Sequence, residues 1–96
     1  MQFLWDERKN ESNITKHDMD FAEAPRLFSG PMRVIPDNRH DYGEDRFVGL
    51  GLLDDRVIVV AFAEPKENVT RIISMRRALI HEKKQYEHYL KQLYGN

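Results

Sequence analysis

The 96-residue sequence predicts an α+β fold in which helices come first, an antiparallel sheet of about four strands follows, and a helix ends the chain. Three observations support this order. Polar, helix-like segments fill the first third, β-rich runs fill residues 46–75, and apolar residues recur with a helical period from Ala78 onward. No internal repeat or Pro/Gly/Ser-rich linker divides the chain, so we expect residues 1–96 to form a single domain.

The first third is predicted to contain two helical segments. Asp6 to His17 is polar, and Ile14 is its one apolar residue. Asp20 can cap a second helix over Phe21 to Phe28. The Ser29-Gly30-Pro31 sequence then ends this helix, because glycine and proline both interrupt helical structure.

The middle of the chain has the pattern of a sheet. Four segments read as short apolar or β-rich runs: residues 32–36, 46–53, 56–64 and 69–75. Polar residues 37–45 are expected to form a loop, Asp54-Asp55 a two-residue hairpin turn, and residues 65–68 the next turn. Because Val57 to Phe62 is apolar on both faces, its strand is predicted to be the central, doubly covered one.

The last segment is predicted to be an amphipathic helix starting at Ala78. Leu79, Tyr86, Leu90 and Leu93 fall along one stripe, with Gly95 beyond the helix end. We expect this stripe to pack on the sheet.

Composition restricts the cellular setting and the chemistry. The chain has no cysteine, so it offers no disulfide framework, thiolate nucleophile or cysteine zinc site. Its first residues lack the order of a signal peptide, and no run is long enough to cross a membrane. We therefore expect a cytoplasmic protein that does not associate with a membrane.

Charge is unevenly distributed although the net charge is only −1. Residues 1–68 carry nine Lys and Arg against fourteen Asp and Glu, whereas residues 69–96 carry six against two. The C-terminal part can therefore hold a polyanion, although solvated helix lysines would give the same pattern.

The strongest cationic segment is Arg71-Ile72-Ile73-Ser74-Met75-Arg76-Arg77. Strand alternation places Arg71 and Arg77 on one face and Ser74 and Arg76 on the other, so the arginines cannot all point one way while the strand stays regular. Arg76 is the best candidate for a phosphate site, because it stands beside Ser74 at the strand end. The alternative is that these arginines form salt bridges to nearby carboxylates.

Two further groups are candidates for chemistry. In the segment 37–46, Glu44 and Arg46 would project from one face as a cation–carboxylate pair, unless the segment is simply a solvated connection. Lys16 and His17 follow the first helical segment, and a histidine can transfer protons near neutral pH. An ordinary surface histidine is the alternative.

Several reaction classes have no support in the sequence. His81 and His88 lie a heptad apart without the zinc-protease spacing, since Gln85 stands where the second histidine would be. The chain also lacks a phosphate-binding glycine loop and a Gly-x-Ser-x-Gly motif. We therefore expect neither a metal nor a cofactor.

The motifs resemble one known family along nearly the whole chain. Phe3-Leu4-Trp5-Asp6-Glu7-Arg8-Lys9, with Asn13 and Lys16-His17, resembles the opening of the BrnT family, and Phe21 and Ala24 match its next helix. Asp41-Tyr42-Gly43-Glu44-Asp45-Arg46 is similar to its Tyr-Gly-Glu-x-Arg loop. Arg71 to Ala78 is similar to its Arg-Ile-Ile-Ser-x-Arg-x-Ala strand exit, followed by Glu82 and Tyr86.

The resemblance implies a RelE-like toxin of a type II toxin–antitoxin system. Such a toxin would cleave RNA without a metal, inhibit translation, and be neutralised by a DNA-binding BrnA-like antitoxin. The complex would be a heterotetramer that touches DNA only through the antitoxin. The extension past Tyr86 is longer than the family pattern and would serve as packing or antitoxin contact.

Cleavage through the 2′-hydroxyl requires stabilisation of a dianionic phosphorane and two proton transfers. We assign Arg46, Arg71 and Arg76 to the phosphate, and Glu44, His17 or Tyr86 to proton transfer. Lys16, Arg77 and Tyr42 are the expected RNA-binding residues. The alternative function is a small domain that binds a partner or a nucleic acid without catalysis.

Overall fold

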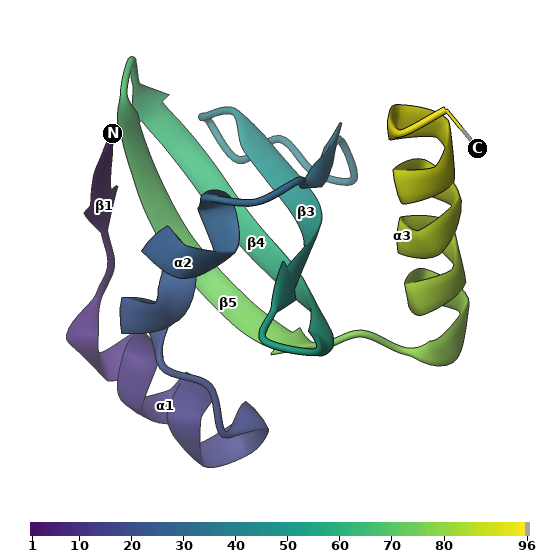
Figure 1. The fold of residues 1–96 in the computed structure, drawn as a ribbon. Coiled ribbons are helices and arrows are strands. Elements are labelled where there is room, and N and C mark those ends of the chain that lie inside the picture. Colours follow the sequence, from purple (N-terminus) through teal and green to yellow (C-terminus); the bar gives the residue numbers. More distant parts are fainter. Residues whose placement is uncertain (96) are drawn as a thin grey trace.

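The computed structural model describes residues 1–95. Its elements, in chain order, are β1 (Gln2–Leu4), α1 (Glu7–His17), the 3₁₀ turn η1 (Phe21–Glu23), α2 (Ala24–Phe28), β2 (Arg33–Pro36), β3 (Arg46–Leu53), β4 (Arg56–Lys66), β5 (Val69–Arg77) and α3 (Ile80–Leu93). The strands form one sheet in the order β1-β5-β4-β3-β2 (Figure 1). The α+β class is therefore confirmed.

The two N-terminal helical segments form where their caps predict. The Asp6 carboxylate accepts hydrogen bonds from the backbone N–H groups of Arg8 and Lys9, which fixes the start of α1. The Asp20 carboxylate caps the second segment in the same way. The prediction of one continuous helix over this segment is wrong, because the structure has η1 followed by α2. Pro25 lies in the first turn of α2, where its missing N–H costs little.

The central strands agree with the sequence pattern. β3 and β4 pair as an antiparallel hairpin around Asp54-Asp55, and Asp54 has the positive φ of 55° that a tight turn demands. β4 is the middle strand, as predicted. It runs two residues further than expected, to Lys66, so the turn to β5 is only Glu67-Asn68, with Asn68 at φ 62°.

The sheet has five strands rather than about four, and it is not wholly antiparallel. The additional strand is β1, whose residues pair in parallel with Val69, Thr70 and Arg71 of β5. Three residues are too few to display an alternating pattern, so β1 gives no strand signal in the sequence. Because β1 is so short, it leaves the second half of β5 as an open sheet edge.

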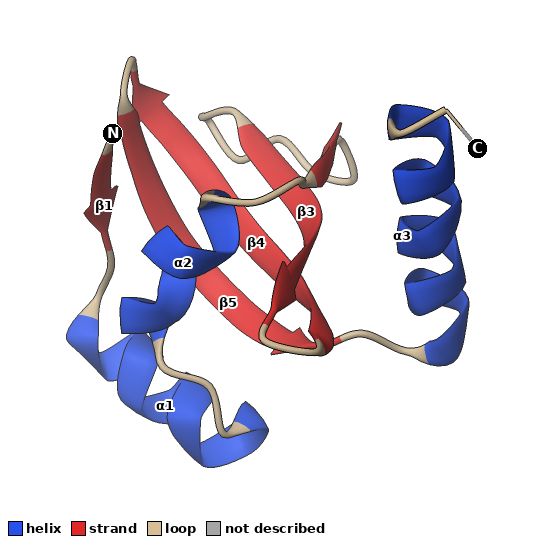
Figure 2. Ribbon diagram, in the orientation of Figure 1, coloured by secondary structure: helices blue, strands red, loops and turns tan. Residues whose placement is uncertain are grey.

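Helices lie on both sides of the sheet (Figure 2). On one side, the 3₁₀ turn and α2 cover the larger core, which contains Phe21, Leu27, Val60, Phe62, Ile72 and Met75. Trp5 packs at the rim of this core with its ring 6.4 Å from that of Phe21. On the other side, α3 contributes Tyr86 to a smaller cluster with Leu50 and Val59.

The terminal helix packs differently from the predicted stripe. It begins at Ile80 rather than Ala78, because Leu79 has an extended backbone and precedes the helix. Tyr86 is only 2% exposed, but Leu79 is 57% and Leu93 51% exposed, so both ends of the stripe face solvent. Gly95 has φ 77° just after the helix, as its position predicts. No helix within residues 1–95 is long and apolar enough to cross a membrane.

Candidate functional site

An irregularity in β5 decides where the arginines point. β5 pairs with β4 through Ile72 and Phe62, but the next pair is Ser74 with Ala61, so β5 contains one extra residue, Ile73. A bulge of this kind shifts the alternation of every residue beyond it. Arg71, Ser74 and Arg76 therefore share one face, and the predicted separation of Arg71 from Arg76, which assumed a regular strand, does not apply.

This face is the one on which α3 packs, and we call it the arginine face. Ladder partners lie on the same side of a sheet. Arg46 of β3 and Arg71 of β5 both pair with Ala63, so they flank that residue on the arginine face. Arg76 pairs with Val59, four residues along β4 and about 13 Å away at ~3.3 Å per residue. The face thus carries cations at two separate places.

Glu44 holds the first pair of cations together. Its carboxylate accepts hydrogen bonds from Arg71 and from Nε of Arg46, the latter at 3.3 Å. The Arg46 guanidinium also lies 4.0 Å from the ring centroid of Tyr42, a cation–π contact. The Arg71 hydrogen bond, assisted by Arg46, lowers the pKa of Glu44. Glu44 is therefore ionised at neutral pH and is a weak proton acceptor.

The second cation, Arg76, is bound by α3. Its Nη1 and Nη2 donate to the two carboxylate oxygens of Glu82 at 2.8 and 2.9 Å, and Nη1 also donates to the carbonyl of Arg77 at 3.2 Å. The Arg76 guanidinium lowers the pKa of Glu82 to about 2. The Arg76 side chain is nevertheless 37% exposed, so it remains accessible to a ligand.

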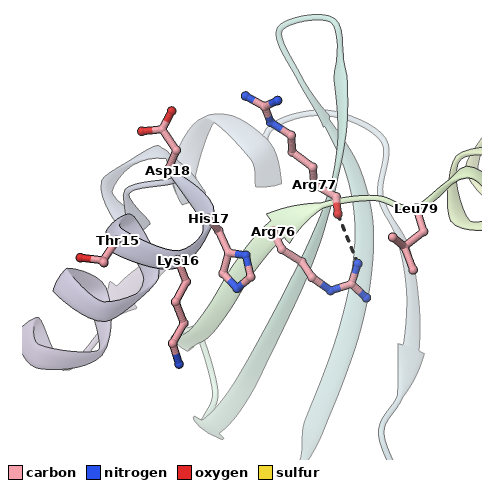
Figure 3. A pocket seen from close by; sticks show the side chains of 7 residues that line it. All are labelled: Thr15, Lys16, His17, Asp18, Arg76, Arg77 and Leu79. Atoms are coloured by element: carbon pink, nitrogen blue, oxygen red, sulfur yellow. Dashed lines mark hydrogen bonds between the residues drawn. The ribbon is translucent and has the colours of Figure 1, made fainter.

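Helix α1 brings a histidine and a lysine to Arg76. Asn13 attaches α1 to the open edge of β5, because its side-chain oxygen accepts from the Met75 N–H at 3.1 Å and its amide donates to the Met19 carbonyl at 3.0 Å. One helical turn later, Lys16 and His17 line an open hollow of about 840 Å³ shared with Arg76. In Figure 3 the imidazole lies on the α1 side of the hollow, and the Arg76 side chain extends from the strand end toward Leu79.

Arg77 also lines this hollow, but its guanidinium points away from that of Arg76 (Figure 3). Arg76 also lines a second cavity, a groove of about 460 Å³ on the arginine face. The floor of this groove includes Val48, Val59 and Ala61, and Ser74 lies beside them. A polyanion that reached Arg76 would thus meet His17 on one side and an apolar floor on the other.

The structure separates Tyr86 from the other predicted site residues. Its ring lies in the core, and its hydroxyl donates to the Pro31 carbonyl at 2.9 Å. Burial raises the pKa of the Tyr86 hydroxyl, which therefore keeps its proton. This position favours a structural role over the predicted proton transfer.

Sequence reasoning did not assign Glu82 to the site, although its position three residues after Leu79 gave a signal. Glu82 accepts a hydrogen bond from the Leu79 N–H at 2.8 Å, the contact of a residue that caps a helix start. Asp37 was likewise not assigned, and its carboxylate accepts two hydrogen bonds from the Arg39 guanidinium at the rim of the groove. The Arg39 guanidinium lowers the pKa of Asp37 to about 2.

The arrangement offers cations that can bind a phosphodiester and an imidazole that can transfer protons. Arginines provide bidentate donors for phosphate oxygens, and a neighbouring imidazole can accept or donate a proton. Within residues 1–95, no three His, Cys, Asp or Glu side chains form a group that could hold a metal ion.

The comparisons with known proteins identify the family. Residues 5–82 match the family profile described as the ribonuclease toxin BrnT of a type II toxin–antitoxin system. A solved structure, the ribonuclease toxin BrnT of Brucella abortus, superposes with a TM-score of 0.67 at 32% sequence identity, over 82% of this chain and 97% of that one. No curated protein gave a match. The chain therefore belongs to the BrnT family of ribonuclease toxins of type II toxin–antitoxin systems.

Proposed function

We propose that this toxin cleaves RNA without a metal ion, by attack of a 2′-hydroxyl on the adjacent phosphorus. The 2′-oxygen loses its proton and forms a bond to phosphorus. The bond from phosphorus to the 5′-oxygen breaks, and that oxygen takes up a proton. The products are a 2′,3′-cyclic phosphate and a free 5′-hydroxyl. The transition state gains negative charge on the phosphoryl oxygens, so fixed cations stabilise it more than the substrate.

The observation that carries this proposal is the position of Arg76 between His17 and the groove. Arg76 and His17 line one hollow, so a phosphodiester strand that lies in it can contact the guanidinium and the imidazole. We assign Arg76 to the scissile phosphate and His17 to proton transfer. The side chain of Glu44 is a weak base because two arginines bind it, so we assign it to orienting Arg46 and Arg71.

The remaining predicted residues extend the RNA-binding surface. Arg46 and Arg71 stand about 13 Å from Arg76 along the sheet, so they would contact a different phosphate of the same RNA strand. Tyr42 lies at the Arg46 end of the site, where a base can stack on an aromatic ring. Lys16 and Arg77 add positive charge around the hollow next to Arg76.

Cleavage of purified RNA in the presence of EDTA tests the proposal. The wild-type toxin should produce 2′,3′-cyclic phosphate ends, and Arg76→Ala or His17→Ala should lower the rate by at least about 100-fold. Arg8→Ala is the matched control, because Arg8 is an exposed cation on α1 and lies outside the linings of both cavities. RNA binding without cleavage would instead support the alternative, a non-catalytic nucleic-acid-binding domain.

We further propose that a BrnA-like antitoxin silences the toxin by covering the arginine face, within a cytoplasmic heterotetramer that reaches DNA through the antitoxin alone. A carboxylate-bearing segment would complement Arg46, Arg71 and Arg76 and would exclude RNA from them. Hydrogen exchange on the complex should show protection around β5 and the 37–46 loop. Protection confined to the hairpin at Asp54-Asp55 would contradict this mode of inhibition.

Translation inhibition follows from the same chemistry if the cleaved RNA is messenger RNA. Expression of the toxin should then reduce amino-acid incorporation before it reduces RNA synthesis, and co-expression of the antitoxin should restore it. The RelE-like character of the fold stays a prediction, since the comparisons identify BrnT relatives.

A further inference from the structure

We propose that Glu82 is a positioning residue that orients Arg76, so that one particular edge of its guanidinium is presented to the RNA phosphate. This inference rests on the proposed function of Arg76. It assigns a role to the first turn of α3, which lies on the opposite side of the sheet from α2 (Figure 1).

The hydrogen bonds of Arg76 show which edge is left open. A guanidinium has five N–H groups in a planar fork. The Glu82 carboxylate accepts a hydrogen bond from one N–H of Nη1 and from one N–H of Nη2, and the Arg77 carbonyl accepts from the other N–H of Nη1. Among the described residues, no hydrogen bond uses the Nε–H or the remaining Nη2–H. These two donors lie side by side on one edge of the fork, which is the arrangement that binds two oxygens of a phosphate.

Glu82 is itself held in place by contacts that do not involve Arg76. Its Oε1 accepts a hydrogen bond from the Leu79 N–H at the start of α3. One helical turn later, Tyr86 anchors the helix in the core through its buried ring and its bond to Pro31. The Glu82 side chain is only 15% exposed. A long, flexible arginine side chain at the end of a strand is thus tied to a rigid carboxylate.

The charge state of Glu82 fits positioning better than proton transfer. The Arg76 guanidinium lowers the pKa of Glu82 to about 2, so the carboxylate stays ionised at neutral pH. A base with so low a pKa accepts protons poorly at neutral pH. The ion pair therefore supplies orientation, and the free edge of Arg76 supplies the contact with the phosphate.

Replacing Glu82 with glutamine tests this role. The neutral amide can accept from one terminal nitrogen of Arg76 but turns a donor toward the other, so the guanidinium loses its fixed orientation. We expect Glu82→Gln to lower kcat by about 100-fold with little change in KM, because misplacing a group acts on the transition state. Glu87→Gln removes the same charge from an exposed position on α3 and should leave kcat unchanged.

Two further measurements exclude a purely structural effect. The pH–rate curve of Glu82→Gln should keep the wild-type shape at a lower height, since the proton-transfer groups are intact. In an Arg76→Lys background, Glu82→Gln should have almost no additional effect on kcat, because a residue that acts only through Arg76 has nothing left to orient. Glu82→Asp, which keeps the charge but shortens the side chain, replaces the glutamine variant if that variant does not fold.

The outcomes separate this proposal from the proposed function. No cleavage by the wild type in EDTA would overturn both. Wild-type cleavage with an unchanged or increased kcat in Glu82→Gln would overturn only the positioning role. An increase in particular would mean that Glu82 competes with the phosphate for Arg76.

Discussion

The attachment of α1 to β5 depends on one side chain, so Asn13→Ala should both unfold the toxin more easily and disturb its site. Asn13 is 5% exposed, and its amide bonds the Met75 N–H and the Met19 carbonyl. Alanine leaves both backbone groups buried without a partner, at about 1–3 kcal/mol each. We therefore expect a loss of about 2–6 kcal/mol, a large part of the ~5–15 kcal/mol that a small domain possesses.

Urea denaturation followed by circular dichroism measures this loss directly. The midpoint should fall with an unchanged slope, and the melting temperature should drop by at least about 8 °C. Ser12→Ala is the control, since Ser12 is exposed on the preceding position of the same helix and should change stability by less than about 0.5 kcal/mol. A loss below about 0.5 kcal/mol for Asn13→Ala would show that the two hydrogen bonds do not hold α1 to the sheet.

Three further predictions concern packing and pH. Tyr86→Ala should cost about 3–5 kcal/mol in chemical denaturation, whereas exposed Leu79→Ala should cost less than about 1 kcal/mol; equal losses would contradict the placement of α3. Gly51→Ala should cost about 1–3 kcal/mol by the same assay, because its new Cβ would lie 2.8 Å from Cδ1 of fully buried Leu27; unchanged stability would show that Leu27 can move. The lowered pKa of Glu82 contributes stability that is present above its ordinary value of 4.5 and is lost as pH falls toward 2. The free energy of unfolding of the wild type should therefore exceed that of Glu82→Gln by about 1–2 kcal/mol at pH 6, after allowance for solvent screening. The melting temperatures of the two proteins should converge near pH 2.

The parts of the fold that sequence reasoning predicted are those governed by local signals. Asp6 and Asp20 cap their helical segments through their own carboxylates, and Asp54-Asp55 turns the chain within two residues. Each of these features depends on residues within a few positions of one another, so the pattern and the structure agree.

The misplaced parts depend on contacts between distant segments. β1 exists as a strand because its three residues pair with Val69 to Arg71, more than sixty residues away. Leu79 matches the helical period but lies on the connection from β5, where the extended backbone turns its side chain to solvent. Periodicity reports which side chains share a helix face, and it does not report where the helix begins relative to the sheet.

Several of the residues predicted for the site lie on one face of the sheet, but their arrangement could not be predicted, and the bulge at Ile73 is one reason. The prediction treated Arg71 to Arg76 as a regular strand, which would place the two arginines on opposite sides of the sheet. The single extra residue reverses that assignment. Its one trace in the sequence is the apolar pair Ile72-Ile73, which interrupts the alternation, and the pairing of β5 with β4 shows that this interruption is a bulge. Glu82 was not predicted as a site residue for a similar reason. Its cap contact is local, but its hydrogen bonds to Arg76 form because the end of β5 lies close to the start of α3. A functional face of this kind requires no unusual motif. A one-residue bulge in a strand that carries the arginines is enough to bring them to the same side of the sheet.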